Sequence, residues 1–336
     1  MDRLNRIYSY WDGENTPSHK IVLEWEQILS SELGLKIVVG SKLWDKICWH
    51  IEKNHLTPIY HSLVPKGELR LVFEMSARLI KRCEFDKNTI PVIIDYWLDD
   101  KYIPEFFEAY GKCPLILITN REVYDLLIST NPTVPIEHWP LSFPDQYAFK
   151  GNENYKKKYE FTIIGRPNPF FIRMLDRYCE NHPDFTYIMS SGGIHDRKYV
   201  TNKGQFVAEG KSRESYLDMI RKTKISCYTT PGLDESKTDS DKFNQVTPRV
   251  MELLCNGCHV IGHYPLTADV KWYRLNEIVP NVNTYKEFEA QLDKMRVTDF
   301  DICKMKSFMS QHYTSVRASM LVNIIKKYNI KIGQEE

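Results

Sequence analysis

The sequence has few of the features that mark membrane-spanning, nucleic-acid-coating or secreted proteins. No stretch of its 336 residues approaches the roughly 20 apolar residues that a membrane-spanning helix needs. The first twenty residues contain no apolar core long enough for a secretory signal. The formal net charge is only +1, which argues against a main role in coating nucleic acid or anionic lipid. We therefore expect a cytoplasmic protein that binds no nucleic acid and makes at most peripheral contact with the inner membrane face.

The eight cysteines are scattered and lie mostly in apolar surroundings, which is typical of small core residues in a reducing compartment. One cysteine pair needs a separate explanation. Cys255, Cys258 and His259 form the C-x-x-C-H pattern that attaches a c-type haem. Haem attachment of this kind normally takes place outside the cytoplasm, and the chain shows no export signal. We therefore interpret the pattern as a coincidence.

Short β-rich runs alternate with helical patterns along the whole chain, which predicts two doubly wound α/β domains. Charged, aperiodic residues around 150–160 indicate a linker, so we place the domains at 1–157 and 158–336. In the first half we expect strands at 6–11, 36–40, 91–97 and 114–119, and helices at 19–33, 67–84 and 120–130. Residues 131–145 contain four prolines, too many for a regular element.

The second half repeats the alternation. We expect strands at 160–165, 185–193, 225–232 and 258–264, and helices at 167–183, 212–224, 247–257, 283–295 and 301–328. Three helix starts are specific, because Asn120, Ser212 and Thr247 are good N-caps and Pro248 suits the first helical turn.

Polar residues follow two strands of the second half, where open α/β sheets bind their ligands. Gly165 and Arg166 end one strand, and the arginine could reach a phosphate. The helix that begins after Thr247 offers amide N–H groups and a positive dipole end, which suit a diphosphate. Arg249 would add charge, and Glu252 could accept hydrogen bonds from two sugar hydroxyls. A turn, a simple cap and a solvent-facing glutamate are the structural alternatives.

These segments, taken in order, resemble the C-terminal half of a GT-B glycosyltransferase. The match is carried by the strand ending in Gly165-Arg166, by "ESYLDMIRKTKIS" and above all by "TPRVMELLCNGCHVIG". It is closest to bacterial family-one-like enzymes of surface-polysaccharide synthesis or spore maturation, and it covers about residues 158–290. The resemblance implies two Rossmann-like domains that face a cleft, and it leaves open that the C-terminal helix crosses back to the first.

The resemblance also implies residue roles. Arg166 would contact the donor diphosphate, amides near Thr247 would bind it, Glu252 would hold the ribose and residues 206–210 would lie against the base. Retaining members carry two glutamates with seven residues between them, and Asn244 occupies the place of the first. Stereochemistry therefore stays open. The resemblance explains C-x-x-C-H as two small residues around a turn at Gly257.

A catalytic base would come from the first domain if the reaction inverts the sugar. The candidates are Asp12 and Glu14 after the first strand, Asp95 after another, and His138 between prolines. Each has a structural alternative: an Asp-Gly turn, a strand end, or a loop residue.

The triplet 239–241 reads D-x-D, a metal-binding pattern of another glycosyltransferase fold. It lies in a polar loop, so we expect no metal and no cofactor. Cationic side chains and amide dipoles would stabilise the departing diphosphate. We expect transfer from a nucleotide-sugar donor to a glycan or lipid-linked glycan acceptor. The alternatives are a nucleotide-sugar epimerase and a non-catalytic sugar-nucleotide-binding module.

Overall fold

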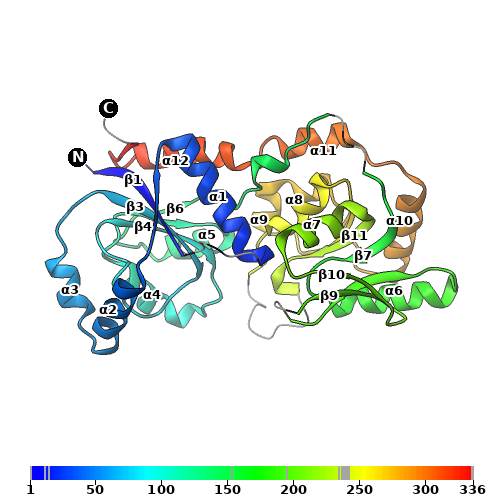
Figure 1. Cartoon of the computed structure of the whole chain (residues 1–336), viewed down its shortest axis with the longest axis horizontal. Helices are drawn as coiled ribbons and strands as arrows, with labels where there is room; N and C mark the ends of the chain where they lie inside the picture. The colour runs from blue at the N-terminus through cyan, green and yellow to red at the C-terminus, as the bar shows by residue number, and fades with distance from the viewer. Residues whose placement is uncertain are drawn as a thin grey trace. The chain divides into compact units, whose positions relative to one another are not determined.

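The computed structural model describes residues 2–10, 13, 16–151, 153, 155–193, 196–233, 235 and 243–333. The chain forms two compact units, each with its own sheet. Unit 1 comprises residues 1–13, 21–145 and 314–336, and unit 2 comprises residues 14–20 and 146–313. In Figure 1, the blue-to-cyan first part of the chain and the red final helix belong to unit 1, while green to orange segments form unit 2.

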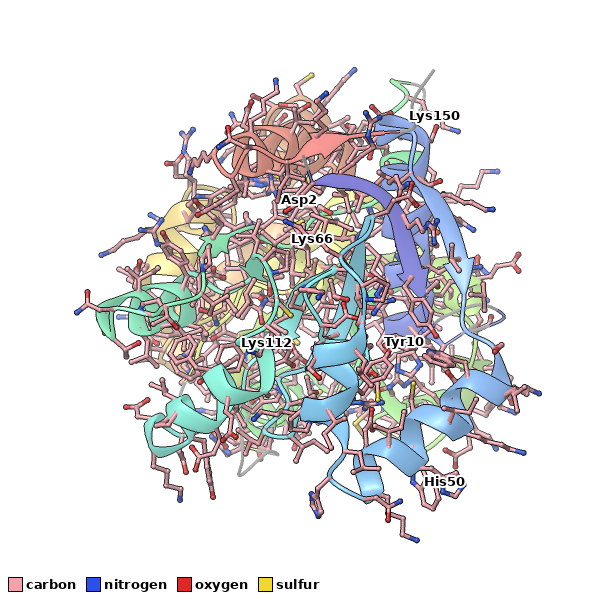
Figure 2. The ribbon with its side chains drawn as sticks, turned by 90° about the vertical axis from the view of Figure 1, so that its left-hand side faces the viewer. Asp2, Tyr10, His50, Lys66, Lys112 and Lys150 are labelled. Carbon is pink, nitrogen blue, oxygen red and sulfur yellow. The ribbon has the colours of Figure 1, made fainter. Side chains whose placement is uncertain are left out.

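Unit 1 contains a parallel sheet in the order β13-β1-β3-β4-β5-β6, with β2 pairing with β1 as well. A sheet of this kind is covered on both faces, so its strands are nearly continuous apolar runs. The strand bounds are β1 Arg3–Ser9, β2 Lys36–Val39, β3 Leu69–Ser76, β4 Thr89–Asp95, β5 Ile116–Ile118, β6 Ile136–His138 and β13 Lys331–Ile332. An ion pair between Lys66 and Asp2, 2.8 Å long, ties the loop before β3 to the start of β1 (Figure 2).

The helices of unit 1 are α1 Pro17–Leu33 from residue 21 onward, α2 Lys42–Lys53, α3 Thr57–Leu63, α4 Ile103–Tyr110, α5 Arg121–Ser129 and α12 Thr314–Lys326. Asn120 caps α5 as predicted, because its side chain accepts hydrogen bonds from the N–H groups of Glu122 and Val123. Helix α12 joins unit 1 through buried Leu321 and Ile325, and Trp139 Nε1 donates to Arg317 O at 2.9 Å.

The division differs from the domains expected at 1–157 and 158–336. The chain returns to unit 1 after residue 313, because α12 packs there and β13 pairs with β1. Residues 150–160, expected to be a linker, belong to unit 2. Tyr155 OH donates to Cys255 O at 2.7 Å, and Lys157 Nζ donates to Asn256 O at 2.8 Å. This segment is therefore held against the end of a unit 2 helix.

The helix expected at residues 67–84 is wrong, since residues 69–76 form strand β3. Its residues Leu71 to Phe73 are all buried, so polar and apolar positions do not alternate as in a half-exposed strand. The proline-rich stretch 131–145 contains the short strand β6, and the helices α2 and α3 were not foreseen.

Unit 2 contains a sheet in the order β10-β9-β8-β7-β11-β12, parallel except for β9 and β10 at one edge. The strand bounds are β7 Tyr159–Ile163, β8 Tyr187–Ser191, β9 Lys198–Thr201, β10 Phe206–Glu209, β11 Thr223–Thr229 and β12 His259–His263. The helices are α6 Pro169–Asn181, α7 Arg213–Lys222, α8 Pro248–Cys255, α9 Ala268–Tyr273, α10 Tyr285–Val297 and α11 Ile302–Met309. Aromatic and aliphatic residues such as Phe161, Leu175 and Phe288 form its core under α6 and α10.

Two predicted helix starts in unit 2 are confirmed. Ser212 and Ser215 form a capping box at α7, and Thr247 is the N-cap residue of α8 with Pro248 in the first turn. Strand β7 is followed by α6 and β8 on one side, whereas β11 lies on its other side. The strand order therefore reverses between β7 and β11. In open α/β sheets, ligands bind beyond the carboxyl ends of the strands at such a point.

None of the helices in the described part of the chain is long and apolar enough to cross a membrane.

Candidate functional site

The loop after β7 and the first turn of α8 meet at the reversal point of the unit 2 sheet. Gly165 follows β7 with φ +85°, and a Cβ atom built there would lie 2.5 Å from Arg249 Cζ. Only glycine therefore allows the Arg249 guanidinium to pack against this backbone. Ser190 Oγ donates to Gly165 O and holds the loop from β8. Two residues predicted for the donor site, 84 positions apart, are thus in direct contact.

The N-terminus of α8 is organised by partners other than its own capping side chain. Thr247 makes no side-chain cap, and its N–H donates to Tyr228 OH at 2.9 Å. Val246 N–H donates to Oδ2 of buried Asp269 at 2.5 Å. Pro248 has no N–H. The following first-turn amides have no intrahelical acceptor, and Thr247 supplies them with no side-chain cap, so within the described part of the chain the helix end can present them to an anion.

Glu252 lies one turn into α8 and is buried, so the solvent-facing alternative is wrong. Both carboxylate oxygens have partners on α7. Arg213 Nη1 donates to Oε1 in a buried ion pair, and Tyr216 OH donates to Oε2 at 2.6 Å. The Arg213 guanidinium also lies 5.5 Å from the ring centre of Tyr147. A carboxylate offers about four acceptor positions, so further hydrogen bonds to Glu252 are chemically allowed.

The electrostatic surroundings keep Tyr216 and Arg249 protonated. Burial raises the pKa of the Tyr216 phenol well above its ordinary value, and the negative charge of Glu252 raises it further. Burial alone would lower the pKa of Arg249, but Tyr216 and Glu252 more than offset this effect and the pKa is raised. Arg249 therefore remains cationic, and Tyr216 remains a hydrogen-bond donor at any physiological pH.

The other predicted donor-site residues lie around this centre. Arg166 follows Gly165 and is exposed. Asn244 Oδ1 accepts from Thr230 Oγ1 at 2.7 Å, which ties the asparagine to the end of β11. Residues 206–210 lie at the antiparallel edge as β10 and its following glycine. Gly210 packs on Tyr199, since a Cβ atom there would be 2.7 Å from the ring.

Tyr199, Arg213 and Tyr216 belong to the cluster and were not predicted. The Tyr199 hydroxyl is buried without a hydrogen-bond partner among the described residues, and burial raises its pKa. The charges of nearby Arg197, Arg249 and Glu252 also act on it. The only sequence signal for Arg213 was a cation directly after the N-cap Ser212, where the helix dipole favours negative charge.

The residues proposed as a base differ in position and in burial. Asp12 and Glu14 lie outside the described residues. Asp95 ends β4 and is half-buried, and His138 ends β6 and is buried, two strands away on the same carboxyl edge. Burial and then the charge of Arg121 lower the pKa of His138 to about 4, so the ring is neutral at pH 7.

A further acid was missed on the same edge. Glu26 of α1 is fully buried, and Ser9 Oγ at the end of β1 donates to its Oε2 at 2.5 Å. Burial raises the pKa of Glu26 to about 8, although the hydrogen bond lowers it. The available sequence signal was a glutamate between Val22 and Leu29, on the apolar stripe of the helix.

The C-x-x-C-H segment packs as predicted around a turn. Gly257 has φ +71°, and a Cβ atom there would lie 2.4 Å from the Tyr155 ring. Cys258 Sγ is buried, 3.0 Å from Thr223 O, and Cys255 is buried on α8. His259 Nε2 lies 3.1 Å from Thr298 O, and burial lowers its pKa. Among residues 2–333 that are described, no group of three His, Cys, Asp or Glu side chains could hold a metal; the D-x-D triplet lies outside them.

Comparisons with known proteins define the fold. No family model matches the chain, and no curated protein matches it in sequence. Solved structures do match. Two are UDP-forming α,α-trehalose-phosphate synthases, from Burkholderia vietnamiensis (TM-score 0.50, 7% identity, 92% of this chain and 87% of that one) and Burkholderia xenovorans (TM-score 0.52, 8% identity, 90% and 84%), the latter with glucose-6-phosphate bound.

A third is the α,α-trehalose 6-phosphate synthase of Burkholderia multivorans, with a TM-score of 0.51, 7% identity and coverage of 82% and 73%. These neighbours have the GT-B fold. At such low identity the likeness establishes architecture, and the predicted fold of two Rossmann-like units of the GT-B class is confirmed.

Proposed function

We propose that this protein is a glycosyltransferase that moves a sugar from a nucleotide-sugar donor to a glycan or lipid-linked glycan acceptor. The observation that carries the proposal is the contact of Gly165 with Arg249 beside the N-terminus of α8. It places a cation and helix N-terminal amides at the point where the unit 2 sheet reverses. The shared fold with UDP-forming enzymes supports the donor class.

In this proposal the diphosphate binds between the loop after β7 and the start of α8. Arg249, Arg166 and the first-turn amides of α8 balance its charge, and they stabilise the leaving diphosphate as the glycosidic bond breaks. This set needs no metal ion. Glu252 accepts hydrogen bonds from the ribose, and Arg213 and Tyr216 fix the orientation of its carboxylate.

The acceptor side of the proposal is assigned to unit 1. An inverting reaction requires a base that takes the acceptor hydroxyl proton. Asp95 is the better placed of the two described candidates, because it is half-buried at a strand end, whereas His138 is almost inaccessible. Asn244 supplies an amide where retaining enzymes have a carboxylate. We propose a bacterial surface polysaccharide as the destination of the sugar.

Thermal-shift measurements with UDP, GDP, ADP, CDP, CMP and dTDP test the donor site. UDP comes first because two structural neighbours form it. A ligand at one hundred times its Kd adds about 2.7 kcal/mol to the stability of the folded protein. The informative variant is Arg166→Gln, because this side chain is exposed and its loss should leave the fold intact.

The matched control is Arg173→Gln, an exposed arginine of α6 that pairs with Glu235. Loss of a charged hydrogen bond costs about 1.5–3 kcal/mol, so Arg166→Gln should bind the nucleotide roughly ten- to one-hundredfold more weakly and the control should not. If no nucleotide stabilises the protein, or both variants bind equally, the site is wrong. Nucleotide binding without release of sugar from any donor, with or without acceptor, favours the binding-module alternative.

A further inference from the structure

Exposed apolar side chains are concentrated on one small part of unit 1. Among the described residues, eight of the fifteen exposed large apolar side chains lie between Val39 and Leu63. This segment contains α2 and α3, which lie at the margin of unit 1 (Figure 1). Leu43 is 71% exposed and Leu63 is 76% exposed, values unusual for leucine in a folded domain. Where exposed apolar side chains gather in this way, they mark an interaction site.

Helix α2 touches unit 1 along a narrow strip. Cys48 is its only buried residue. At about 100° per residue, the direction opposite Cys48 passes through Leu43, Lys46 and His50. Figure 2 shows His50 at the outer edge of unit 1, consistent with this orientation. The rest of α2 is therefore open to solvent on three sides.

Charge is segregated around this helix. On the projection its outward half carries the apolar residues Leu43, Ile47 and Trp49 and the basic residues Lys42, Lys46 and Lys53. The two acids, Asp45 and Glu52, fall on the inward half. Glu52 Oε1 accepts from Cys83 N at 3.0 Å and faces the protein. The outward half thus combines leucine, isoleucine and tryptophan with three lysines, while Asp45 is exposed at its side.

The apolar surface continues beyond α2. The ring centres of Trp44 and Tyr60 of α3 are 6.2 Å apart. Ile59 and Leu63, also on α3, are exposed. On the other side, Trp49 and Ile80 line a groove of about 580 Å³ between α2, α3 and α4. Lys53 and Lys81 are also part of its lining, as are Glu52 and Glu108, and Lys81 Nζ pairs with Glu108 Oε1 at 2.8 Å, so Lys53 supplies the unneutralised charge beside Trp49. Tryptophan beside lysine is typical of segments that lie in the interface of a bilayer.

We propose that α2 and α3 form a docking surface for an anionic phospholipid membrane. Leu43, Ile47, Ile59 and Leu63 would enter the headgroup region, and the lysine heads would extend to lipid phosphates along their aliphatic stems. A second copy of this chain fits less well. An isologous contact would bring the three outward lysines of α2 together, and of the acids on this helix only the exposed Asp45 could partly offset their charge. The docking surface shares no residue with the donor site, so membrane binding and the proposed transfer reaction can be tested independently.

Vesicle flotation tests the proposal with the full-length protein. The wild type is mixed with phosphatidylcholine vesicles that contain or lack phosphatidylglycerol. The test variant is Leu43→Gln/Ile47→Gln, and the matched control is Val297→Gln, an 86% exposed valine at the end of α10. We expect binding to the anionic vesicles, at least tenfold weaker binding of the test variant, and unchanged binding of the control.

The charge contribution is tested with Lys42→Gln/Lys46→Gln. Each lysine near an anionic surface is worth about 1 kcal/mol, so this variant should bind about 30-fold more weakly at low salt, with less difference at high salt. Nucleotide thermal shifts of all variants should equal those of the wild type, which shows that unit 2 is intact.

Three outcomes would overturn the assignment: no flotation of the wild type with anionic vesicles, equal flotation of the Leu43→Gln/Ile47→Gln variant, or a dimer in lipid-free solution that this variant dissociates. The last outcome would identify α2 and α3 as a contact between copies of this chain.

Discussion

The substitution Glu252→Gln tests the buried cluster of unit 2 most directly. It keeps the size of the side chain and removes the negative charge that faces Arg213. The side chains of Glu252 and Arg213 are only 6% and 5% exposed, so solvent cannot replace the lost charge. Tyr216 can still donate to the amide oxygen of glutamine. The change therefore isolates the ion pair from the packing of α7 on α8.

Breaking a buried ion pair by neutralising one partner costs about 3–5 kcal/mol. The Tyr147 ring over Arg213 offers a weak cation–π contact that remains, which favours the lower part of this range. Tyr216→Phe removes one hydrogen bond to a charged acceptor and should cost about 1.5–3 kcal/mol. The double variant Arg213→Met/Glu252→Gln should lose less than the sum of its two single changes, because no charge is left buried.

Urea unfolding followed by circular dichroism measures these losses, with the m-value checked for constancy between variants. Arg173→Gln serves as the control, since its partner Glu235 is exposed and surface pairs contribute little. Two results would refute a buried ion pair here: a cost below about 1 kcal/mol for Glu252→Gln, which is the range of a surface pair, or a double variant that loses the full sum. Either result would mean that the carboxylate and the guanidinium do not share a buried contact.

Three further predictions concern Gly165, Glu26 and His138. Gly165→Ala should destabilise unit 2 by about 1–2 kcal/mol through its positive φ, and it should weaken nucleotide binding because its Cβ would displace Arg249; equal binding would contradict the contact. Burial raises the pKa of Glu26 to about 8, so the folded state holds a proton that the unfolded state releases above about pH 4.5. The wild type should therefore lose stability relative to Glu26→Gln as pH rises from about 5 to 8, and parallel melting curves would exclude the shift. The pKa of His138 is lowered to about 4, so its contribution has the opposite direction: it is present above about pH 6.5 and is lost as pH falls toward 4, and an NMR titration that gives an ordinary value would show that the ring is solvated.

Local signals in the sequence were sufficient for many elements. Asn120 and Ser212 each cap a helix with their own side chain, because an N-cap contacts amides only two or three residues away. The strand of residues 259–263 and the turn at Gly257 were also predicted correctly. Periodicity failed at residues 69–76, because a strand buried on both faces and a buried helix have similar apolar content.

In the candidate site, too, local signals indicated single residues, whereas their contacts with distant residues came only from the structure. Gly165, Thr247, Arg249 and Glu252 were proposed from their places beside strands and at a helix start, which are properties of short segments. Only the tertiary structure showed that Gly165 supports Arg249 and that Arg213 pairs with Glu252, since these partners are 84 and 39 residues apart. Only the tertiary structure showed that α12 belongs to unit 1 and that the apolar residues of α2 are exposed. Sequence determines what each segment can form, whereas the packing of distant segments decides which charges are paired and which apolar faces stay uncovered.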